Sequence, residues 1–174
     1  RLSTNQVLES TQLISWSDDS THLYTYDMNY IFIWNSYDWN KVKQVESPLG
    51  LSDIQISPDE RFAYISGMDS VLKISLANGY MEGNYNNDFY GLSYLSLSPD
   101  GQKISYCGRS GYCRIANTDK PEDYTDFGVN STRYGGSSAW SLDGRFASFG
   151  GTYGEFSILD AKTLTPILES SLST

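Results

Sequence analysis

The stretch LSLSPDGQKISYCG, residues 95–108, carries the clearest fold signal in this 174-residue chain. A Ser-Pro-Asp-Gly tetrapeptide separates two short runs in which apolar and polar residues alternate. Alternation of this kind is typical of half-buried β-strands. The tetrapeptide is typical of a tight turn, because Pro presets the backbone dihedral of its second position and Gly relieves the crowded exit. The stretch therefore predicts a β-hairpin.

The same turn recurs along the chain at a nearly constant interval. Related segments are WSDDSTHLYTYD from residue 16, ISPDERFAYISG from residue 56 and WSLDGRFASFGG from residue 140. The serines that open the four turns are Ser17, Ser57, Ser98 and Ser141. Their steps are 40, 41 and 43 residues, which indicates an internal repeat. The aspartates of the repeated turn are Asp18, Asp59, Asp100 and Asp143, and we expect them to shape the turn rather than to take part in a reaction.

Each repeat unit contains enough sequence for four short strands. The strand after the turn is followed by a short loop and a third strand: YIFIWN (30–35), VLKISL (71–76), YCRIAN (112–117) and FSILD (156–160). A looser fourth strand completes each unit. Four strands in a period of about 40 residues are typical of propeller blades, so we predict an all-β fold, a β-propeller built of four-stranded antiparallel blades.

The predicted blades divide the chain as one propeller domain or segment, residues 1–174. Their approximate ranges are 11–47, 49–87, 91–129 and 136–172. Residues 1–10 (RLSTNQVLES) are similar to TPILESSLS near the end of the chain, so we expect them to form the last strand of a preceding blade.

These units resemble the WD-repeat β-propellers over essentially the whole chain. The resemblance rests on the turns and on the residue pairs that stand where that family shows Trp-Asp: Trp34-Asn35, Ser75-Leu76, Ala116-Asn117 and Leu159-Asp160. The Gly-His dipeptide of the family is absent, and the only histidine, His22, lies just after a turn. Related propellers that share the Ser-Pro-Asp-Gly turn, including periplasmic and peptidase-associated ones, stay open as alternatives.

The resemblance implies a ring of seven or eight blades, of which about four are present. Three explanations are open: the chain is part of a longer propeller, a second copy or another chain completes the ring, or four blades close by themselves. An incomplete ring would leave two apolar blade faces, each able to take a partner.

Charge and composition narrow the function classes. The chain has 12 Lys and Arg against 21 Asp and Glu, a net charge of −9 and a pI near 4.4. Nucleic-acid binding needs clustered cations, so we expect no nucleic-acid partner. No apolar run approaches the roughly 18 residues of a membrane helix, so we expect no membrane insertion.

We find no catalytic, cofactor or metal motif in the sequence. One histidine and two cysteines six residues apart cannot provide a nucleophile triad or the usual zinc set. No Gly-rich phosphate loop is present. The sequence therefore predicts that the chain is not an enzyme.

The two cysteines, Cys107 and Cys113, flank GRSGY in a predicted hairpin. Two buried thiols are the preferred interpretation, and a disulfide is the alternative. A disulfide and the Asn130-Ser131-Thr132 sequon would favour an extracellular location, whereas the WD-repeat resemblance favours the cytoplasm, so the compartment stays open.

Propellers of this family most often bind partners through loops around the channel mouth. In this chain the corresponding loops contain Asp27, Asp69, Arg109, Tyr112, Arg133, Tyr134 and Tyr153. Tyr and Arg are common in binding hot spots. We therefore expect a non-catalytic protein–protein interaction scaffold whose partners are other protein subunits, including a second copy or another propeller half. The alternative is a ligand-binding or enzyme-associated propeller that holds a glycan or an ion or gates a peptidase.

Overall fold

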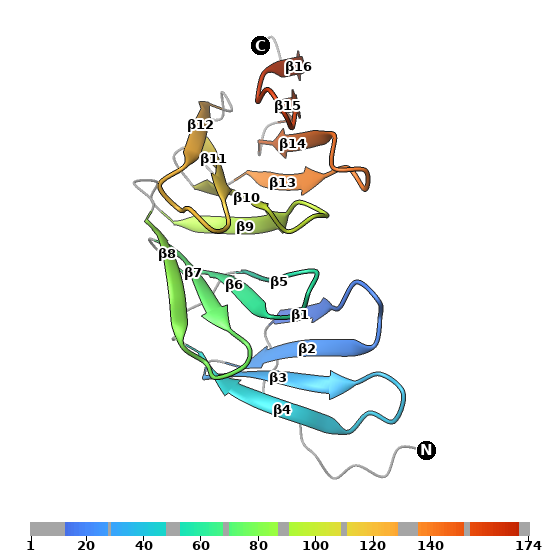
Figure 1. Ribbon diagram of the computed structural model, residues 1–174. Helices are drawn as coiled ribbons and strands as arrows, with labels where there is room; N and C mark the ends of the chain where they lie inside the picture. The colour runs from blue at the N-terminus through green and yellow to red at the C-terminus, as the bar shows by residue number, and fades with distance from the viewer. Residues whose placement is uncertain are drawn as a thin grey trace.

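In the structure, a computed structural model, the described residues form sixteen β-strands in four antiparallel sheets of four strands each (Figure 1). It describes residues 13–27, 29–47, 53–67, 70–86, 91–108, 111–128, 136–151 and 154–170. The predicted all-β class and the four four-stranded blades are confirmed. The strand predicted for residues 1–10 and the sequon at Asn130 lie outside the described residues.

The strands follow one another in the order of the chain within each blade. Blade 1 contains β1 (Leu13–Trp16), β2 (His22–Asp27), β3 (Tyr30–Asn35) and β4 (Lys41–Glu46). Blade 2 contains β5 (Asp53–Ile56), β6 (Phe62–Ser66), β7 (Ser70–Ser75) and β8 (Met81–Asn86). Blade 3 contains β9 (Leu92–Leu97), β10 (Lys103–Gly108), β11 (Tyr112–Asn117) and β12 (Tyr124–Gly128). Blade 4 contains β13 (Ser137–Trp140), β14 (Phe146–Gly150), β15 (Phe156–Asp160) and β16 (Pro166–Ser170).

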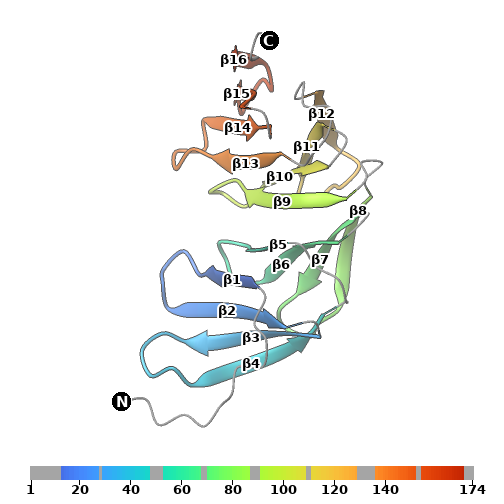
Figure 2. The ribbon, with the colours of Figure 1, turned by 180° about the vertical axis from the view of Figure 1, so that it is seen from behind.

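The four blades form an open arc. The first strands lie beside one another, β1 next to β5, β5 next to β9 and β9 next to β13. Strand β4 lies at one end of the arc and β16 at the other, in both views (Figures 1 and 2). The described blades therefore do not close into a four-bladed ring, and that alternative is wrong for this structure.

The hydrophobic core lies between successive blades. Residues that pair across antiparallel strands point to the same face of the sheet, and successive residues point to opposite faces. In blade 1 the pair Tyr24–Ile33 packs toward blade 2, whereas the neighbouring pair Leu23–Trp34 points away from it. Similar clusters form between blades 2 and 3, around Tyr106, and between blades 3 and 4. An inner blade is thus buried on both faces, which explains its nearly continuous apolar strands.

The repeated turn is held by one hydrogen-bond network. In blade 3 the Ser98 hydroxyl donates to Asp100 Oδ1 (2.6 Å), which also accepts from the backbone N–H of Gln102 (3.0 Å). The N–H of Lys103 donates to Ser98 Oγ (2.9 Å). The other three turns repeat the Ser–Asp bond with Asp19, Asp59 and Asp143.

The aspartate of the first turn is therefore Asp19 and not Asp18, as the sequence had suggested. Ser17 donates to Asp19 Oδ1 (2.8 Å), two residues further along the chain, as in the other three turns. Asp18 occupies the position of Pro58 and Pro99.

The fourth position of each turn has a left-handed backbone. Gly101 and Gly144 have φ of 69° and 68°, and Ser20 and Glu60 adopt similar values of 60° and 56°. At Gly101 an added Cβ would lie 2.9 Å from Pro58 Cδ in blade 2, so this turn also packs closely against the preceding blade.

We expect Gly101→Ala to destabilise the fold by about 1–2 kcal/mol, because a side chain is strained in this conformation and the Pro58 contact adds a clash. Gly128→Ala is the matched control, since its Cβ would meet no atom closer than 4.0 Å. The midpoints of urea unfolding measure both effects. Equal midpoints for the two variants would contradict the role of the Gly101 turn.

Candidate functional site

Two residues of the predicted binding rim lie in the described part of the chain. Asp27 ends β2, and its Oδ1 accepts hydrogen bonds from the N–H groups of Asn29 (3.0 Å) and Tyr30 (2.9 Å), so it shapes the β2–β3 turn. Tyr112 begins β11 in another blade and is 50% exposed. The other predicted rim residues, Asp69, Arg109, Arg133, Tyr134 and Tyr153, lie outside the described residues.

At the opposite ends of the sheets, where the β1–β2 and β3–β4 turns and their counterparts lie, successive blades are separated by grooves. The grooves have volumes of about 500 Å³ between blades 1 and 2, about 240 Å³ between blades 2 and 3 and about 580 Å³ between blades 3 and 4. The residue that follows the left-handed fourth position of a turn lines each groove. It is Arg61 between blades 1 and 2, Gln102 between blades 2 and 3, and Arg145 between blades 3 and 4. The repeat therefore produces three related grooves.

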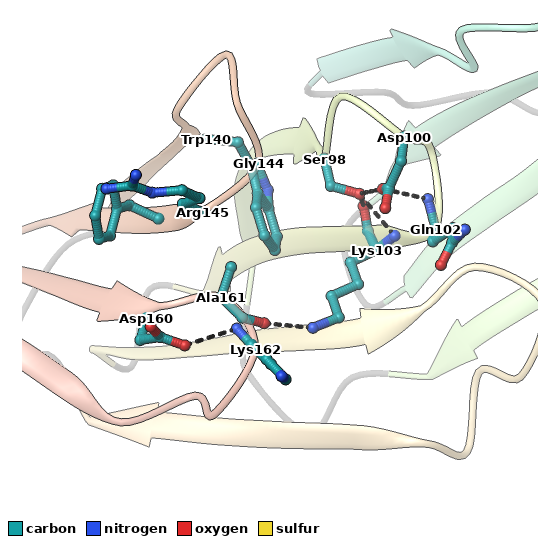
Figure 3. A pocket seen from close by; sticks show the side chains of 11 residues that line it. Ser98, Asp100, Gln102, Lys103, Trp140, Gly144, Arg145, Asp160, Ala161 and Lys162 are labelled. Atoms are coloured by element: carbon teal, nitrogen blue, oxygen red, sulfur yellow. Dashed lines mark hydrogen bonds between the residues drawn. The ribbon is translucent and has the colours of Figure 1, made fainter.

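The largest groove combines aromatic and charged side chains (Figure 3). Trp140 contributes apolar surface. Arg145 also lines the groove, and its guanidinium lies 4.9 Å from the centre of the Phe146 ring, which belongs to the opposite face of the sheet. Lys103 and Lys162 add positive charge. The groove can accommodate a small polar ligand with one apolar face.

A lysine crosses each of the three grooves. Lys43 Nζ donates to the carbonyl oxygen of Leu76 (2.7 Å), Lys73 Nζ to that of Thr118 (3.0 Å), and Lys103 Nζ to that of Ala161. The three accepting residues are equivalent, because each donates its own N–H to the preceding turn of its blade. The lysines thus anchor each blade to the next. They belong to different strands, β4, β7 and β10, so the repeat of 40 to 43 residues does not reveal them.

The only histidine belongs to the contact between blades 1 and 2. His22 Nδ1 lies 2.9 Å from Glu60 Oε2, and the Tyr24 hydroxyl donates to the same carboxylate. Burial, reinforced by the Glu60 carboxylate, raises the pKa of Tyr24. These contacts give His22 and Glu60 a structural role.

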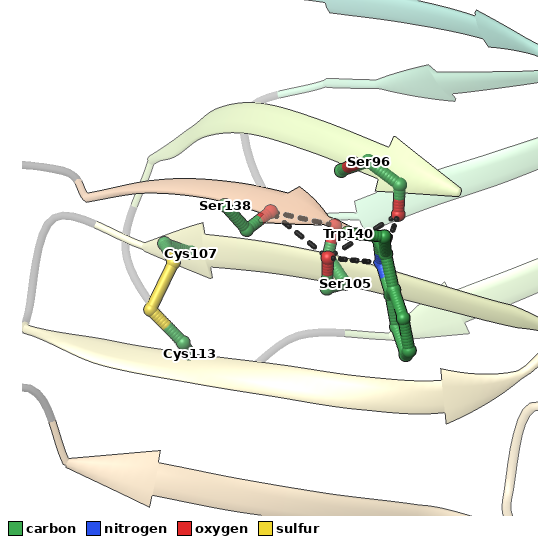
Figure 4. The surroundings of a disulfide bond; sticks show 6 residues. All are labelled: Ser96, Ser105, Cys107, Cys113, Ser138 and Trp140. Carbon is green, nitrogen blue, oxygen red and sulfur yellow. Dashed lines mark hydrogen bonds between the residues drawn. A yellow bond between two sulfur atoms is a disulfide. The ribbon is translucent and has the colours of Figure 1, made fainter. Parts of the chain in front are cut away.

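A second polar network joins blades 3 and 4 (Figure 4). The Trp140 indole N–H donates to Ser105 Oγ (3.0 Å) and to the carbonyl oxygen of Ser96 (3.3 Å), and Ser105 Oγ donates to that carbonyl as well (3.2 Å). Nearby, Cys107 and Cys113 pair across β10 and β11, are fully buried and form a disulfide. The sequence-based preference for two separate thiols therefore differs from the structure.

One face of blade 1 has no described blade packed on it. By strand register the first three strands contribute Ile14, Trp16, Leu23, Thr25, Phe32 and Trp34 to this blade 1 free face. Strand β4 adds Lys41, Gln44 and Glu46. Ile14 is 65% exposed and Trp16 is 49% exposed. The rings of Phe32 and Trp34 lie 6.2 Å apart, so the aromatic surface is continuous across the third strand.

The other end of the arc has a corresponding surface. The blade 4 free face consists of Ala139, Phe146, Ser148, Phe156, Ile158 and Leu168. Phe156 is 40% exposed and Leu168 is 51% exposed. Apolar side chains that inner blades bury are therefore open to solvent at both ends.

The sequence predicts two apolar end faces but does not identify their residues. A signal was present in blade 1, where Tyr30 to Trp34 is an unbroken run of five apolar or aromatic residues. Such a run is typical of a strand buried on both faces.

The described residues contain no group of three or more His, Cys, Asp or Glu side chains that could hold a metal ion. In the same part of the chain no helix is long and apolar enough to cross a membrane.

Comparison with known proteins identifies the fold and nothing narrower. No protein-family model matches the chain, and no curated protein matches it. Among solved structures, Kuenenia stuttgartiensis hydrazine synthase matches with a TM-score of 0.72 and 14% sequence identity over 95% of this chain. The chain spans about half of that protein, 51%. In all, 1344 solved chains match, so the architecture is too widespread to specify a function.

The turn carboxylates should make stability depend on pH. Partial burial of Asp100 opposes ionisation, but the Ser98 hydroxyl and the Gln102 N–H stabilise the carboxylate, and the net result is a lowered pKa. The pKa values of Asp19, Asp59 and Asp143 are lowered as well. A carboxyl group whose pKa is lower in the folded state stabilises the fold above its unfolded pKa. That stabilisation is lost as the pH falls through the folded pKa.

We therefore expect the free energy of unfolding to fall on acidification below about pH 4. Asp100→Asn retains an oxygen acceptor but not the charge, so it should flatten this dependence. Asp100→Ala removes the acceptor and should cost about 1 kcal/mol at neutral pH as well. Urea unfolding across a pH series measures both, and an unchanged acid limb in Asp100→Asn would contradict the role of this carboxylate.

Proposed function

We propose that this chain is a non-catalytic protein–protein interaction scaffold, a propeller segment that works within a larger assembly. The observation that carries the proposal is the pair of free faces at the two ends of the arc. Trp16 on the first face and Leu168 on the second are each about half exposed. Contiguous exposed apolar surface marks interaction sites, and Trp is among the residues that most often dominate binding energy.

The remaining polar groups support a scaffold rather than an enzyme. The turn aspartates are engaged in hydrogen bonds within their turns, and His22 is paired with Glu60. The lysines of the grooves are bound to backbone carbonyls. These contacts give the turn aspartates, His22 and the groove lysines a role in stabilising the fold.

We also propose that the blades are divergent relatives of WD repeats. The second residue of the Trp-Asp-like pairs supports this proposal. Asn35 Oδ1 accepts from the N–H groups of Tyr37 (2.8 Å) and Asp38 (3.3 Å), and Asn117 and Asp160 bind the following turns in the same way. Asn and Asp are therefore placed at this position for a turn that all three blades share.

A tagged form of the chain, incubated with an extract of its source cells, tests the scaffold proposal. We expect at least one protein, another copy of the chain included, to be retained in stoichiometric amount. Retention should be lost with Trp16→Glu or Leu168→Glu, because a buried unpaired charge opposes binding. Leu142→Glu is the control, since Leu142 is 98% exposed in a turn outside both faces. A chain that retains no protein would contradict the proposal.

The alternative function is a ligand-binding propeller, and the groove between blades 3 and 4 favours it. Trp140 provides an aromatic surface in a groove that Arg145 and Lys162 also line, a combination suited to a glycan with acidic groups. A panel of acidic glycans, with Ca²⁺ as a separate sample, should then raise the Tm of the wild type by several degrees at saturation. Arg145→Ala should abolish the glycan shift. A Tm that no compound in the panel changes would contradict this alternative.

A further inference from the structure

We propose that the blade 4 free face of one copy binds the blade 1 free face of a second copy, so that two chains complete an eight-bladed ring. The inference rests on the proposed scaffold function and names its partner. It follows from a polar contact between blades 3 and 4 whose two halves recur on the free faces.

The donor half of this contact recurs on blade 1. In blade 4, Trp140 pairs with Ala147, which in turn pairs with Leu159. In blade 1, Trp16 pairs with Leu23, which in turn pairs with Trp34. Trp16 therefore occupies the place of Trp140, on the face that would meet a preceding blade.

The acceptor half recurs on blade 4. At the contact between blades 3 and 4, Trp140 donates to Ser105 Oγ and to the carbonyl oxygen of Ser96, and these two residues pair across β9 and β10. The equivalent pair in blade 4 is Ser148 and Ala139. Ser148 Oγ donates to the carbonyl oxygen of Ala139 at 3.2 Å, as Ser105 does to Ser96. The blade 4 free face thus presents the acceptor that a tryptophan in the place of Trp16 requires.

The two faces are also mostly uncharged. The twelve side chains named for the two faces are uncharged, and charges enter the blade 1 free face from β4, where register also places Lys41 and Glu46. Lys41 Nζ lies 5.4 Å from the centre of the Phe32 ring. At the three internal contacts a lysine crosses the groove, but the equivalent positions of blade 4 are Phe146, Ile158 and Leu168. At these three positions the blade 4 free face is therefore more apolar than its internal counterparts.

A second copy fits these faces better than an unrelated partner. The proposed contact continues an interface that the chain already forms three times within itself. Because the two complementary faces lie on different ends of one chain, the contact is head-to-tail, and such contacts form rings when the rotation closes. Four blades are half of an eight-bladed ring, within the usual range for propellers.

Size-exclusion chromatography with light scattering over a dilution series tests the pairing. We expect the wild type to reach twice its monomer mass of 19.5 kDa at high concentration. Trp16→Glu and Leu168→Glu should each remain monomeric with unchanged circular dichroism, and Leu142→Glu should dimerise like the wild type. Trp16→Phe keeps the ring but removes the indole N–H, and we expect it to weaken dimerisation by about three- to tenfold.

Mixing the two charged variants tests the head-to-tail geometry. Trp16→Glu retains an intact blade 4 free face, and Leu168→Glu retains an intact blade 1 free face. An equimolar mixture should therefore form a heterodimer through one intact contact. A dimer that survives in either single variant, or a mixture that stays monomeric while the wild type dimerises, would overturn the proposal.

A wild type that is monomeric at every concentration would also overturn the pairing. If the monomeric chain still retains a different protein, and Trp16→Glu abolishes that retention, only the second copy is the wrong partner and the scaffold function stands. If the chain retains nothing at all, both proposals fail.

Discussion

The packing of one blade on the next is the interaction on which the rest of this structure depends. A four-stranded sheet buries little by itself, because its strands alternate between two faces that both need a neighbour. Tyr24 and Ile33 of blade 1 become buried only because Ile65 and Ile74 of blade 2 lie against them. The same relation joins blades 2 and 3 around Tyr64 and Tyr106, two aromatic side chains that are almost completely buried.

Polar contacts determine how the apolar faces are aligned. Lys43, Lys73 and Lys103 each donate to an equivalent backbone carbonyl of the next blade. Lys73 is only 7% exposed, and its ammonium group donates to the carbonyl oxygen of Thr118 and to Asp119 Oδ1. Burying an ammonium group is costly unless its donors are bound. A blade that rotated or slid along its neighbour would break these contacts, and the lysines therefore favour one alignment.

The sequence predicted those features that depend on local chemistry. The Ser-x-Asp turn repeats at a fixed spacing, and each turn needs only residues close in the chain, as Ser98 and Asp100 show. In the first turn two aspartates are adjacent, and the Ser-x-Asp spacing of the other turns corresponds to Asp19, which accepts the hydrogen bond from Ser17, and not to Asp18. The lysine anchors could not be predicted, because Lys43 and Lys103 reach the equivalent carbonyl from different strands. The pairing of Trp140 with Ser105 depends on side chains 35 residues apart and likewise needs the fold.

Each blade face needs a neighbouring surface to bury its apolar side chains. In an open arc the two end faces have no described blade against them, so a partner must supply that surface. The side chains that stabilise an inner blade are the same kind that Ile14 and Trp16 present to solvent at one end and Phe156 and Leu168 at the other. At about 25 cal/mol per Å² of apolar surface, covering such a face contributes to stability in the same way as an internal contact does. Binding of a partner at these faces therefore also stabilises the folded end blades. A partner whose blade face has a tryptophan at the position of Trp140 would bury the blade 4 free face and repeat the hydrogen bonds that Trp140 forms with Ser96 and Ser105.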